Sequence, residues 1–363
     1  MPHHKMIRCC LTLALVGGAL TCQGAKAETP RKPKAVAPAL PPLDLKRIAD
    51  DEARGIKFSA DKRTLVKYNF ALPDKEYAIP GGVTAVGEEA FGGIAPAESN
   101  ELTVTIPSSV TTVGKRAFSA VTKVTVSPDN PRFFTDAAGG LFDRKAKKLL
   151  YLPRYFSKVY TLPDGVEVIG EGAFDGCLGL TGVILPASVT TIEEGAFDGV
   201  VKVTTPPENQ WFFTDTAGAL IDRKEKKLLR LPRNFSGAYS IPDGVTAIGK
   251  QAFAGCRDLT GATIPAGVKT IGEEAFAGCR ELNALTIPPS VTAIGKGAFA
   301  GGEKLTGVTV PAGVKTIGRG AFAHCPCEAS ILLKFPEYRR DAEMETRYAN
   351  PRPKSAPGID ADR

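Results

Sequence analysis

The chain has 363 residues, 43% hydrophobic and 23% charged, with 38 Gly, 28 Pro and a formal net charge of +7. A chain this long and apolar can bury a large core, which excludes a disordered protein. The modest positive charge gives no reason to expect a nucleic-acid partner. Only three histidines occur, His3, His4 and His324, so chemistry that needs several imidazoles is excluded.

Residues 1–27 have the pattern of a signal peptide. Lys5 and Arg8 precede a mostly apolar stretch over residues 9–20, and the small-x-small pattern that signal peptidases cut ends at Ala27. The apolar stretch is too short to span a membrane. We therefore expect cleavage near Ala27, no transmembrane segment afterwards, and export to the periplasm, the cell surface or the medium. Lipidation at Cys22 is the alternative, although the preceding residues match a lipoprotein signal poorly.

A short phrase recurs along most of the remaining chain. Each copy has an aliphatic residue before a proline, Val three residues after it, Ile or Val three further on, and then Ala-Phe. The prolines are Pro80, Pro107, Pro163, Pro186, Pro242, Pro265, Pro288 and Pro311, and the phenylalanines eleven residues later are Phe91, Phe118, Phe174, Phe197, Phe253, Phe276, Phe299 and Phe322. One such unit cannot bury its own apolar positions, so we expect the units to stack with a continuous core.

A single unit predicts two short strands. Leu259 and Ile264 belong to an alternating stretch that reads as a strand, and Pro265 ends it because proline has no N–H to donate. Ile271 then returns along the opposite wall, and Phe276 fills the interior. The stack therefore has an open strand before each proline and a second strand on the opposite wall after it.

The unit from Cys256 to Phe276 closely resembles the BspA-type leucine-rich repeat, which occurs in a family of bacterial and protozoan surface proteins. The resemblance covers residues 58–336, with departures such as Glu193 at a glycine position. It implies a β-rich leucine-rich repeat solenoid that is curved and has repeats of about 23 residues. It also implies β-hairpin insertions and short capping helices. Members of the family are associated with attachment to host matrix proteins, cells and other bacteria.

The two longest intervals between successive prolines, from Pro107 to Pro163 and from Pro186 to Pro242, are duplicates of each other. The segment Asn130–Asp136 matches Asn209–Asp215, and Asp143–Leu150 matches Asp222–Leu229. A charged run between two apolar runs predicts a β-hairpin with the charges at its tip. A degraded third copy, Phe58–Val66, opens the array.

The segments on either side of the array differ from it in composition. Residues 28–57 are a Pro/Lys-rich linker followed by a short N-terminal capping helix, which we expect at Leu43–Arg54. Repeats fill residues 58–336 and end in a strand at Ile331–Phe335. Residues 337–363 are a C-terminal helix and a tail with the composition of a disordered segment.

Four cysteines, Cys177, Cys256, Cys279 and Cys325, each follow a repeat phenylalanine by three residues. This regularity predicts a ladder of small buried side chains. Cys256 and Cys279 fall on neighbouring repeats, about 5 Å apart, so a disulfide between them is the alternative to two buried thiols. Cys325-Pro326-Cys327 lacks the four ligands of a structural zinc site.

No set of residues predicts catalysis, a cofactor or a metal. His324 has no nucleophile motif to pair with. Adjacent glutamates recur in one turn, as Glu88-Glu89, Glu193-Glu194 and Glu273-Glu274. Glycosidases use paired carboxylates, but adjacent side chains in a turn point apart, and we interpret these as solvated loops. We therefore expect a protein that is not an enzyme.

Two surfaces are candidates for ligand binding. The open strands point small, nearly uncharged side chains to the concave side, among them Thr161, Ile184, Thr263, Thr286 and Thr309. The hairpin tips repeat a basic cluster, Arg144, Lys145, Lys147 and Lys148 in one copy and Arg223, Lys224, Lys226 and Lys227 in the other, with Trp211 as an aromatic neighbour. Such clusters can bind polyanions, although ordinary solubilising charge at a hairpin tip is the simpler interpretation.

These observations favour a non-enzymatic exported recognition scaffold. The resemblance implies an adhesin-like protein whose ligands are proteins, such as extracellular-matrix proteins, and the basic clusters add sulfated polysaccharide as a possible ligand class. A periplasmic structural or assembly protein that uses its concave face for protein contacts is the alternative, and a glycan-active enzyme is a third. The identity of the ligand and the oligomeric state are not written in the sequence.

Overall fold

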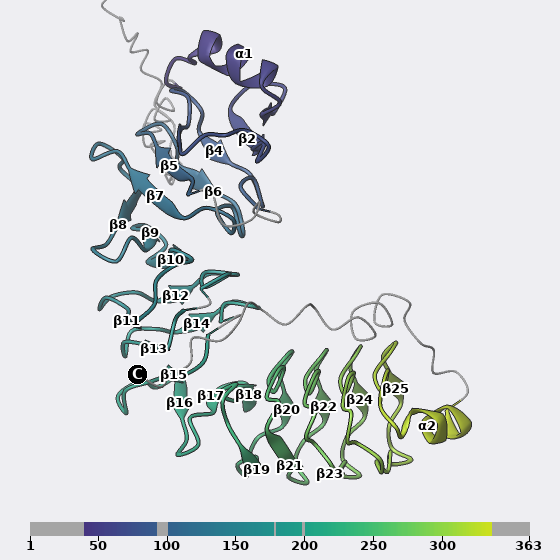
Figure 1. Ribbon diagram of the computed structural model, residues 1–363. Coiled ribbons are helices and arrows are strands. Elements are labelled where there is room, and N and C mark those ends of the chain that lie inside the picture. The colour runs from purple at the N-terminus through teal and green to yellow at the C-terminus, as the bar shows by residue number, and fades with distance from the viewer. Residues whose placement is uncertain (1–39, 93–100, 178, 198–199, 336–363) are drawn as a thin grey trace, which may run out of the picture. The chain divides into compact units, whose positions relative to one another are not determined.

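The structure is a computed structural model that describes residues 40–92, 101–177, 179–197 and 200–335. The repeats belong to one compact unit that begins at Pro41. Short strands follow one another as a ladder, with helices α1 (Leu45–Ala53) and α2 (Glu328–Lys334) at its two ends (Figure 1). The predicted signal peptide, most of the linker and residues 337–363 lie outside the described residues.

Each regular repeat unit, or rung, contributes two short strands, as the sequence predicts, except the rung of Pro311, which has only the strand after the proline. In one rung, β21 (Leu259–Thr263) comes before Pro265 and β22 (Thr270–Ile271) comes after it. Both pair in parallel with the equivalent strands of the next rung, so that Thr263 lies beside Thr286 and Thr270 beside Ala293. The chain is therefore a β-solenoid of leucine-rich repeat type.

The strands before the prolines form three parallel sheets, which we call the pre-proline sheets. Their members are β3 (Glu76–Ala78), β5 (Thr103–Ile106) and β7 (Lys123–Val126); β11 (Val159–Thr161), β13 (Gly182–Ile184) and β15 (Val203–Thr204); and β19 (Gly237–Ser240), β21 and β23 (Ala284–Thr286). Each of the first two sheets stops where the next insertion begins.

The strands after the prolines form the post-proline sheets, which the insertions join. The first of these sheets contains β1 (Lys57–Phe58), β2 (Thr64–Lys67), β4 (Ala85–Val86) and β6 (Thr112–Val113). The second contains β8 (Phe133–Thr135), β9 (Leu141–Asp143), β10 (Lys148–Tyr151), β12 (Val168–Ile169) and β14 (Thr191–Ile192). The third contains β16 (Phe212–Thr214), β17 (Leu220–Asp222), β18 (Lys227–Arg230), β20 (Ala247–Ile248), β22, β24 (Ala293–Ile294) and β25 (Thr316–Ile317). Strands β6 and β14 therefore end their sheets.

Each of the two long intervals contains the predicted hairpin, and its last strand takes the place of a post-proline strand. Strands β16 and β17 are antiparallel, as are β17 and β18, while β18 pairs in parallel with β20. A buried asparagine begins each insertion. Asn209 Nδ2 donates to the carbonyls of Pro186 and Val189, both at 3.1 Å, and its Oδ1 accepts from the amides of Trp211 and Phe212.

The repeat phenylalanines are all buried and stack between rungs, but the core is not continuous. Phe253, Phe276, Phe299 and Phe322 form one column with ring centroids 4.3–5.2 Å apart. The buried apolar residues, however, separate into three large clusters whose boundaries fall in the two insertions. The expectation of one continuous core is corrected here, because Leu152 and Leu231 stand where the hydrogen-bond ladder would place a phenylalanine.

The two ends of the array are covered differently. Helix α1 lies within the expected range, begins after Asp44, whose carboxylate accepts from the Arg47 amide, and is followed by Gly55 at φ +86°. The predicted strand at Ile331–Phe335 is wrong, because residues up to Lys334 belong to helix α2. An apolar run of this length does not distinguish a strand from a buried helix segment.

Candidate interaction surfaces

The two hairpin tips have the same local geometry. In the first copy the Asp143 carboxylate accepts from the amides of Lys145 and Ala146, both at 2.9 Å, and Lys147 has φ +48°. In the second, Asp222 accepts from the Glu225 amide at 2.7 Å and Lys226 has φ +50°. The repeated aspartate therefore closes each turn and sets the direction of the basic side chains.

The eight basic tip residues divide into exposed and half-buried members. Arg144, Lys145, Lys147, Arg223, Lys224 and Lys226 are exposed, and Lys148 and Lys227 are half-buried. Several already have contacts: Lys147 and Lys148 form ion pairs with Glu167 and Glu193 at 2.5 and 2.6 Å, and the guanidinium of Arg144 lies 4.3 Å from the centre of the Phe134 ring. The cluster is therefore less free for a ligand than its composition indicates.

Trp211 changes the second insertion more than the sequence alone predicts. Its counterpart Arg132 forms an ion pair with the buried Asp143 at 2.8 Å. Trp211 cannot do so, and within the described part of the chain Asp222, the counterpart of Asp143, has no ion-pair partner. The indole is 38% exposed and has the Lys224 ammonium 5.6 Å from its centre.

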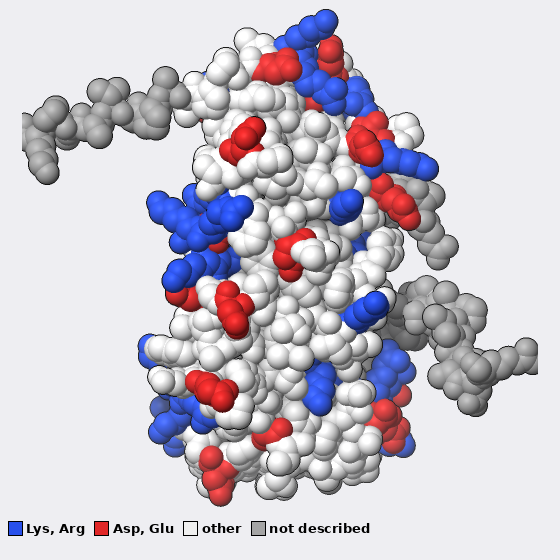
Figure 2. All heavy atoms as spheres, turned by 90° about the vertical axis from the view of Figure 1, so that its left-hand side faces the viewer, with Lys and Arg blue, Asp and Glu red and all other residues white. Residues whose placement is uncertain are grey.

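The predicted strand-face residues all point to solvent. Thr161, Ile184, Thr263, Thr286 and Thr309 are exposed on or beside the pre-proline sheets. The side of the molecule turned to the viewer in Figure 2 has uncharged areas between scattered Asp and Glu side chains, and most of its Lys and Arg lie towards the margins. Thr309 lies in a stretch without strand structure, because β23 ends its sheet.

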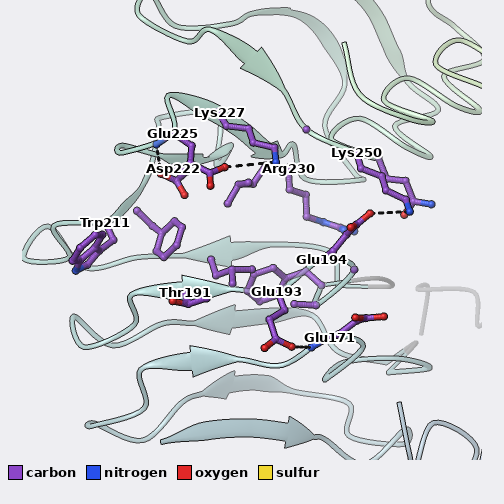
Figure 3. A pocket seen from close by; sticks show the side chains of 18 of the residues that line it. Glu171, Thr191, Glu193, Glu194, Trp211, Asp222, Glu225, Lys227, Arg230 and Lys250 are labelled. Carbon is purple, nitrogen blue, oxygen red and sulfur yellow. Dashed lines mark hydrogen bonds and ion pairs between the residues drawn. The ribbon is translucent and has the colours of Figure 1, made fainter. Parts of the chain in front are cut away.

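A groove of about 920 Å³ lies where the second insertion interrupts the post-proline sheets. Strand β14 and the turn after it form one wall, and the β17–β18 hairpin forms the other (Figure 3). Trp211 lies at one end and the Glu194–Lys250 ion pair, at 2.8 Å, at the other. The groove arises because an inserted hairpin, rather than a regular rung, follows β14.

Ion pairs span both interruptions, with the charges exchanged. Lys115 binds Glu171 across the first interruption at 2.6 Å, and Glu194 binds Lys250 across the second at 2.8 Å. The two pairs occupy equivalent positions of the duplicated stretch. The hydrogen bond from Lys250 holds the pKa of Glu194 below its usual value. The sequence analysis did not identify these ion pairs. Their only signal in the sequence is that the lysine and the glutamate exchange places between the two duplicated stretches.

The repeated glutamates are not all solvated, which corrects our interpretation. Glu274 is only 7% exposed and accepts from the Gln251 amide at 2.8 Å. Burial raises the pKa of Glu193, but hydrogen bonds from Lys148 and the Glu171 amide outweigh it, and the pKa lies below its usual value. These carboxylates hold neighbouring rungs together.

The four ladder cysteines are buried free thiols, together with Cys327. Cys279 and Cys325 donate to the carbonyls of Phe253 and Phe299 at 3.1 and 2.9 Å. Burial raises the pKa of Cys177 and of Cys256 to about 12. Within the described ranges, no three His, Cys, Asp or Glu side chains are grouped so as to hold a metal ion.

The fold and its hairpins define a leucine-rich repeat protein, and the comparison of sequence families identifies its type. The model of the BspA type leucine rich repeat region matches six copies, over residues 63–133, 155–207 and 236–336. The chain therefore belongs to the BspA-type leucine-rich repeat family. A search of curated proteins found no match. Neither helix of the described chain has the length and apolarity needed to cross a membrane.

Solved structures of bacterial leucine-rich repeat proteins are similar to this chain. A leucine-rich repeat protein from Eubacterium ventriosum is 20% identical, with a TM-score of 0.44, and the match covers 69% of this chain and 64% of that one. A leucine rich cell surface protein from Faecalibacterium prausnitzii is 23% identical (TM-score 0.46; 74% and 83% covered). The pneumococcal vaccine antigen PcpA is 21% identical (TM-score 0.43; 70% and 78% covered). The chain thus spans less than two thirds of the Eubacterium protein.

Proposed function

We propose that the chain is an exported, adhesin-like recognition scaffold that binds macromolecular ligands through its surface and is not an enzyme. Extracellular-matrix proteins and sulfated polysaccharide are the ligand classes that we propose. The observation that supports this most directly is the duplicated basic tip, in which exposed cations recur at matching positions of two hairpins. A rigid stack loses little conformational entropy on binding, so many weak contacts can add up.

Retention on immobilised ligands tests this proposal. We expect the protein to be retained on heparin, laminin or fibronectin and eluted from heparin by salt, because charge pairs at a surface are screened. A tip variant, with Lys145, Lys224 and Lys226 changed to Ser, should elute from heparin at lower salt with an unchanged melting temperature. The matched control changes the exposed Lys158, Lys269 and Lys315 to Ser. Equal elution of both variants would remove the tips from the site, and no retention on any ligand would contradict the proposal.

A periplasmic assembly protein is the second candidate, and one observation favours it. Val159 and Ile184 on neighbouring pre-proline strands are 53% and 40% exposed, which suits a protein contact. Antibody labelling of whole cells separates the two candidates. Labelling that appears only after the envelope is made permeable would support the periplasmic role and overturn surface adhesion.

A further inference from the structure

The edge of strand β14 carries carbonyl groups that pair in every continuing rung. In the part of the stack that follows the second insertion, Thr246 O accepts from the Lys269 amide at 2.8 Å, and Ile248 O accepts from the Gly272 amide at 2.9 Å. Their equivalents at β14 are the carbonyls of Thr190, the residue before the strand, and of Ile192. These two accept no hydrogen bond from any described residue, because β14 is the last strand of its sheet.

The groove leaves space for a strand beside these carbonyls. Thr190, Thr191 and Ile192 line one wall, and the opposite wall is the β17–β18 hairpin (Figure 3). Its volume of about 920 Å³ is within the range of sites that enclose a ligand. An exposed strand edge next to open space is the feature to which proteins add an extended peptide as a further strand.

Comparison of the two interruptions shows why the second one is open. At the first, Arg116 reaches across to Asp175 at 2.9 Å, and Arg132 covers Asp143. The positions equivalent to Arg116, Asp175 and Arg132 are occupied in the second by Gly195, Ala254 and Trp211, so both arginines are missing. Asp222 therefore lines the groove with its carboxylate unmatched by a cation among the described residues.

We propose that this groove binds an extended peptide segment of a partner protein. The segment pairs as an added strand with the carbonyls of Thr190 and Ile192, and its Lys or Arg side chain binds Asp222 in the way that Arg132 binds Asp143. This inference rests on the proposed function and specifies one partner for one site. Lys224 and Lys227 of the second tip also line the groove, but the proposed contacts use Thr190, Ile192 and Asp222, so peptide binding and heparin retention are tested with different variants and each can fail without the other.

A peptide copied from the chain itself is the appropriate probe. Residues 266–273 (Ala-Gly-Val-Lys-Thr-Ile-Gly-Glu) contain β22 and donate from Lys269 and Gly272 to β20 and the residue before it, in the register that β14 offers. The peptide keeps the glycine at the position of Gly272, because in the stack a Cβ at Gly272 would lie 2.7 Å from the backbone of Gly249. Trp211 is the single tryptophan of the chain and lines the groove, so its fluorescence reports occupancy.

Titration of the full chain with this capped peptide tests the inference. We expect a saturable change in Trp211 emission. A peptide N-methylated at the positions of Lys269 and Gly272 should bind at least about fivefold more weakly, since two donors are removed. Asp222→Asn, whose Oδ1 can still accept from the Glu225 amide, should weaken binding of the unmodified peptide by a similar factor. The matched control Asp243→Asn, at an exposed turn, should not.

Three results would overturn the inference. They are no saturable change up to millimolar peptide, equal binding of the N-methylated peptide, or an emission shift with protein concentration alone, which would mean that a second copy of the chain fills the groove. Retention of the tip variant and the wild-type protein on heparin is measured separately. A negative peptide titration with positive heparin retention therefore removes the groove and leaves the proposed function standing.

Discussion

Single polar side chains fix the places where the repeat is interrupted. Asn130 and Asn209 are both nearly fully buried and use the amide to donate to two carbonyls of the preceding rung and the oxygen to accept from two amides of the insertion. Four hydrogen bonds satisfy each side chain. These two asparagines therefore determine where the chain leaves the regular stack and begins a hairpin.

Removing one of these side chains should destabilise the protein strongly. Asn209→Ala leaves two carbonyls and two amides without their partner, and a buried unsatisfied group costs about 1–3 kcal/mol. We expect a loss of about 2–4 kcal/mol in the free energy of unfolding, measured by denaturant titration. Asn283→Ala, at an exposed position, serves as the control. A loss no larger than that of the control would show that the asparagine does not anchor the insertion.

The buried thiols make stability depend on alkaline pH. Burial raises the pKa of Cys177 to about 12, whereas the unfolded chain has about 8.5. The thiolate therefore forms first in the unfolded state, and the stabilisation present below about pH 8.5 is lost as pH rises towards 12.

Between pH 8 and 10 under reducing conditions, wild type should lose about 2 kcal/mol more free energy of unfolding than Cys177→Ala. Denaturant titrations at several pH values measure this difference. Parallel pH dependences of the two proteins would contradict the buried environment that we assign to Cys177.

At the scale of an element, the rung is held together by a close approach between turns. A Cβ added at Gly295 would lie 2.5 Å from the backbone of Gly272 and Glu273, whereas one at Gly307 would meet nothing within 4 Å. Gly272 and Gly318 have the same close approach to the rung before them. The glycine after each of these post-proline strands is therefore a packing requirement of the stack.

Gly295→Ala should lower the free energy of unfolding by about 1–3 kcal/mol, because the neighbouring backbone must move apart. Gly307→Ala should change it by less than about 0.5 kcal/mol. Thermal and denaturant unfolding of the two variants measure the difference. Similar stabilities would mean that the turns are not packed as closely as described.

The sequence predicted the rungs well because their signals are local and repeated. Proline ends each open strand, and the Phe positions, the hairpins and helix α1 follow from spacing. The groove could not be predicted in this way, since it depends on Gly195 and Trp211 standing where the first duplicate has Arg116 and Arg132, whose contacts with Asp175 and Asp143 the sequence does not show. Helix α2 was missed because the apolar run from Ile331 has no strand or helix period.

At the scale of the whole molecule, the two insertions divide the stack into three blocks. Phe118 stacks on Phe91, and Phe197 on Phe174, but the next residue along each column is not a stacked phenylalanine: Tyr151 meets Phe118 edge-on, and Arg230 stands at the equivalent position of the second insertion. At equivalent positions, Tyr151 donates to Val121 O at 2.7 Å and Arg230 to Val200 O at 2.6 Å. Polar groups therefore enter the interior at both junctions, beside apolar residues of each insertion that pack on the blocks to either side.

This division also places the candidate sites. The basic tips belong to the insertions, and the groove lies on the edge strand that the second insertion leaves uncovered. In a stack, stability is a sum of rung and interface contributions, so a weak interface separates units that open independently. Both proposed binding sites therefore depend on the way in which the stack is interrupted.

Hydrogen exchange of the full chain, followed by mass spectrometry in increasing denaturant, tests this account most directly. Amides that donate to the preceding rung, such as those of Gly170, Gly249 and Gly272, should fall into three groups with distinct opening free energies. The boundaries should lie within residues 133–151 and 212–230. One common opening free energy for all rungs, or boundaries inside the regular repeats, would contradict the account.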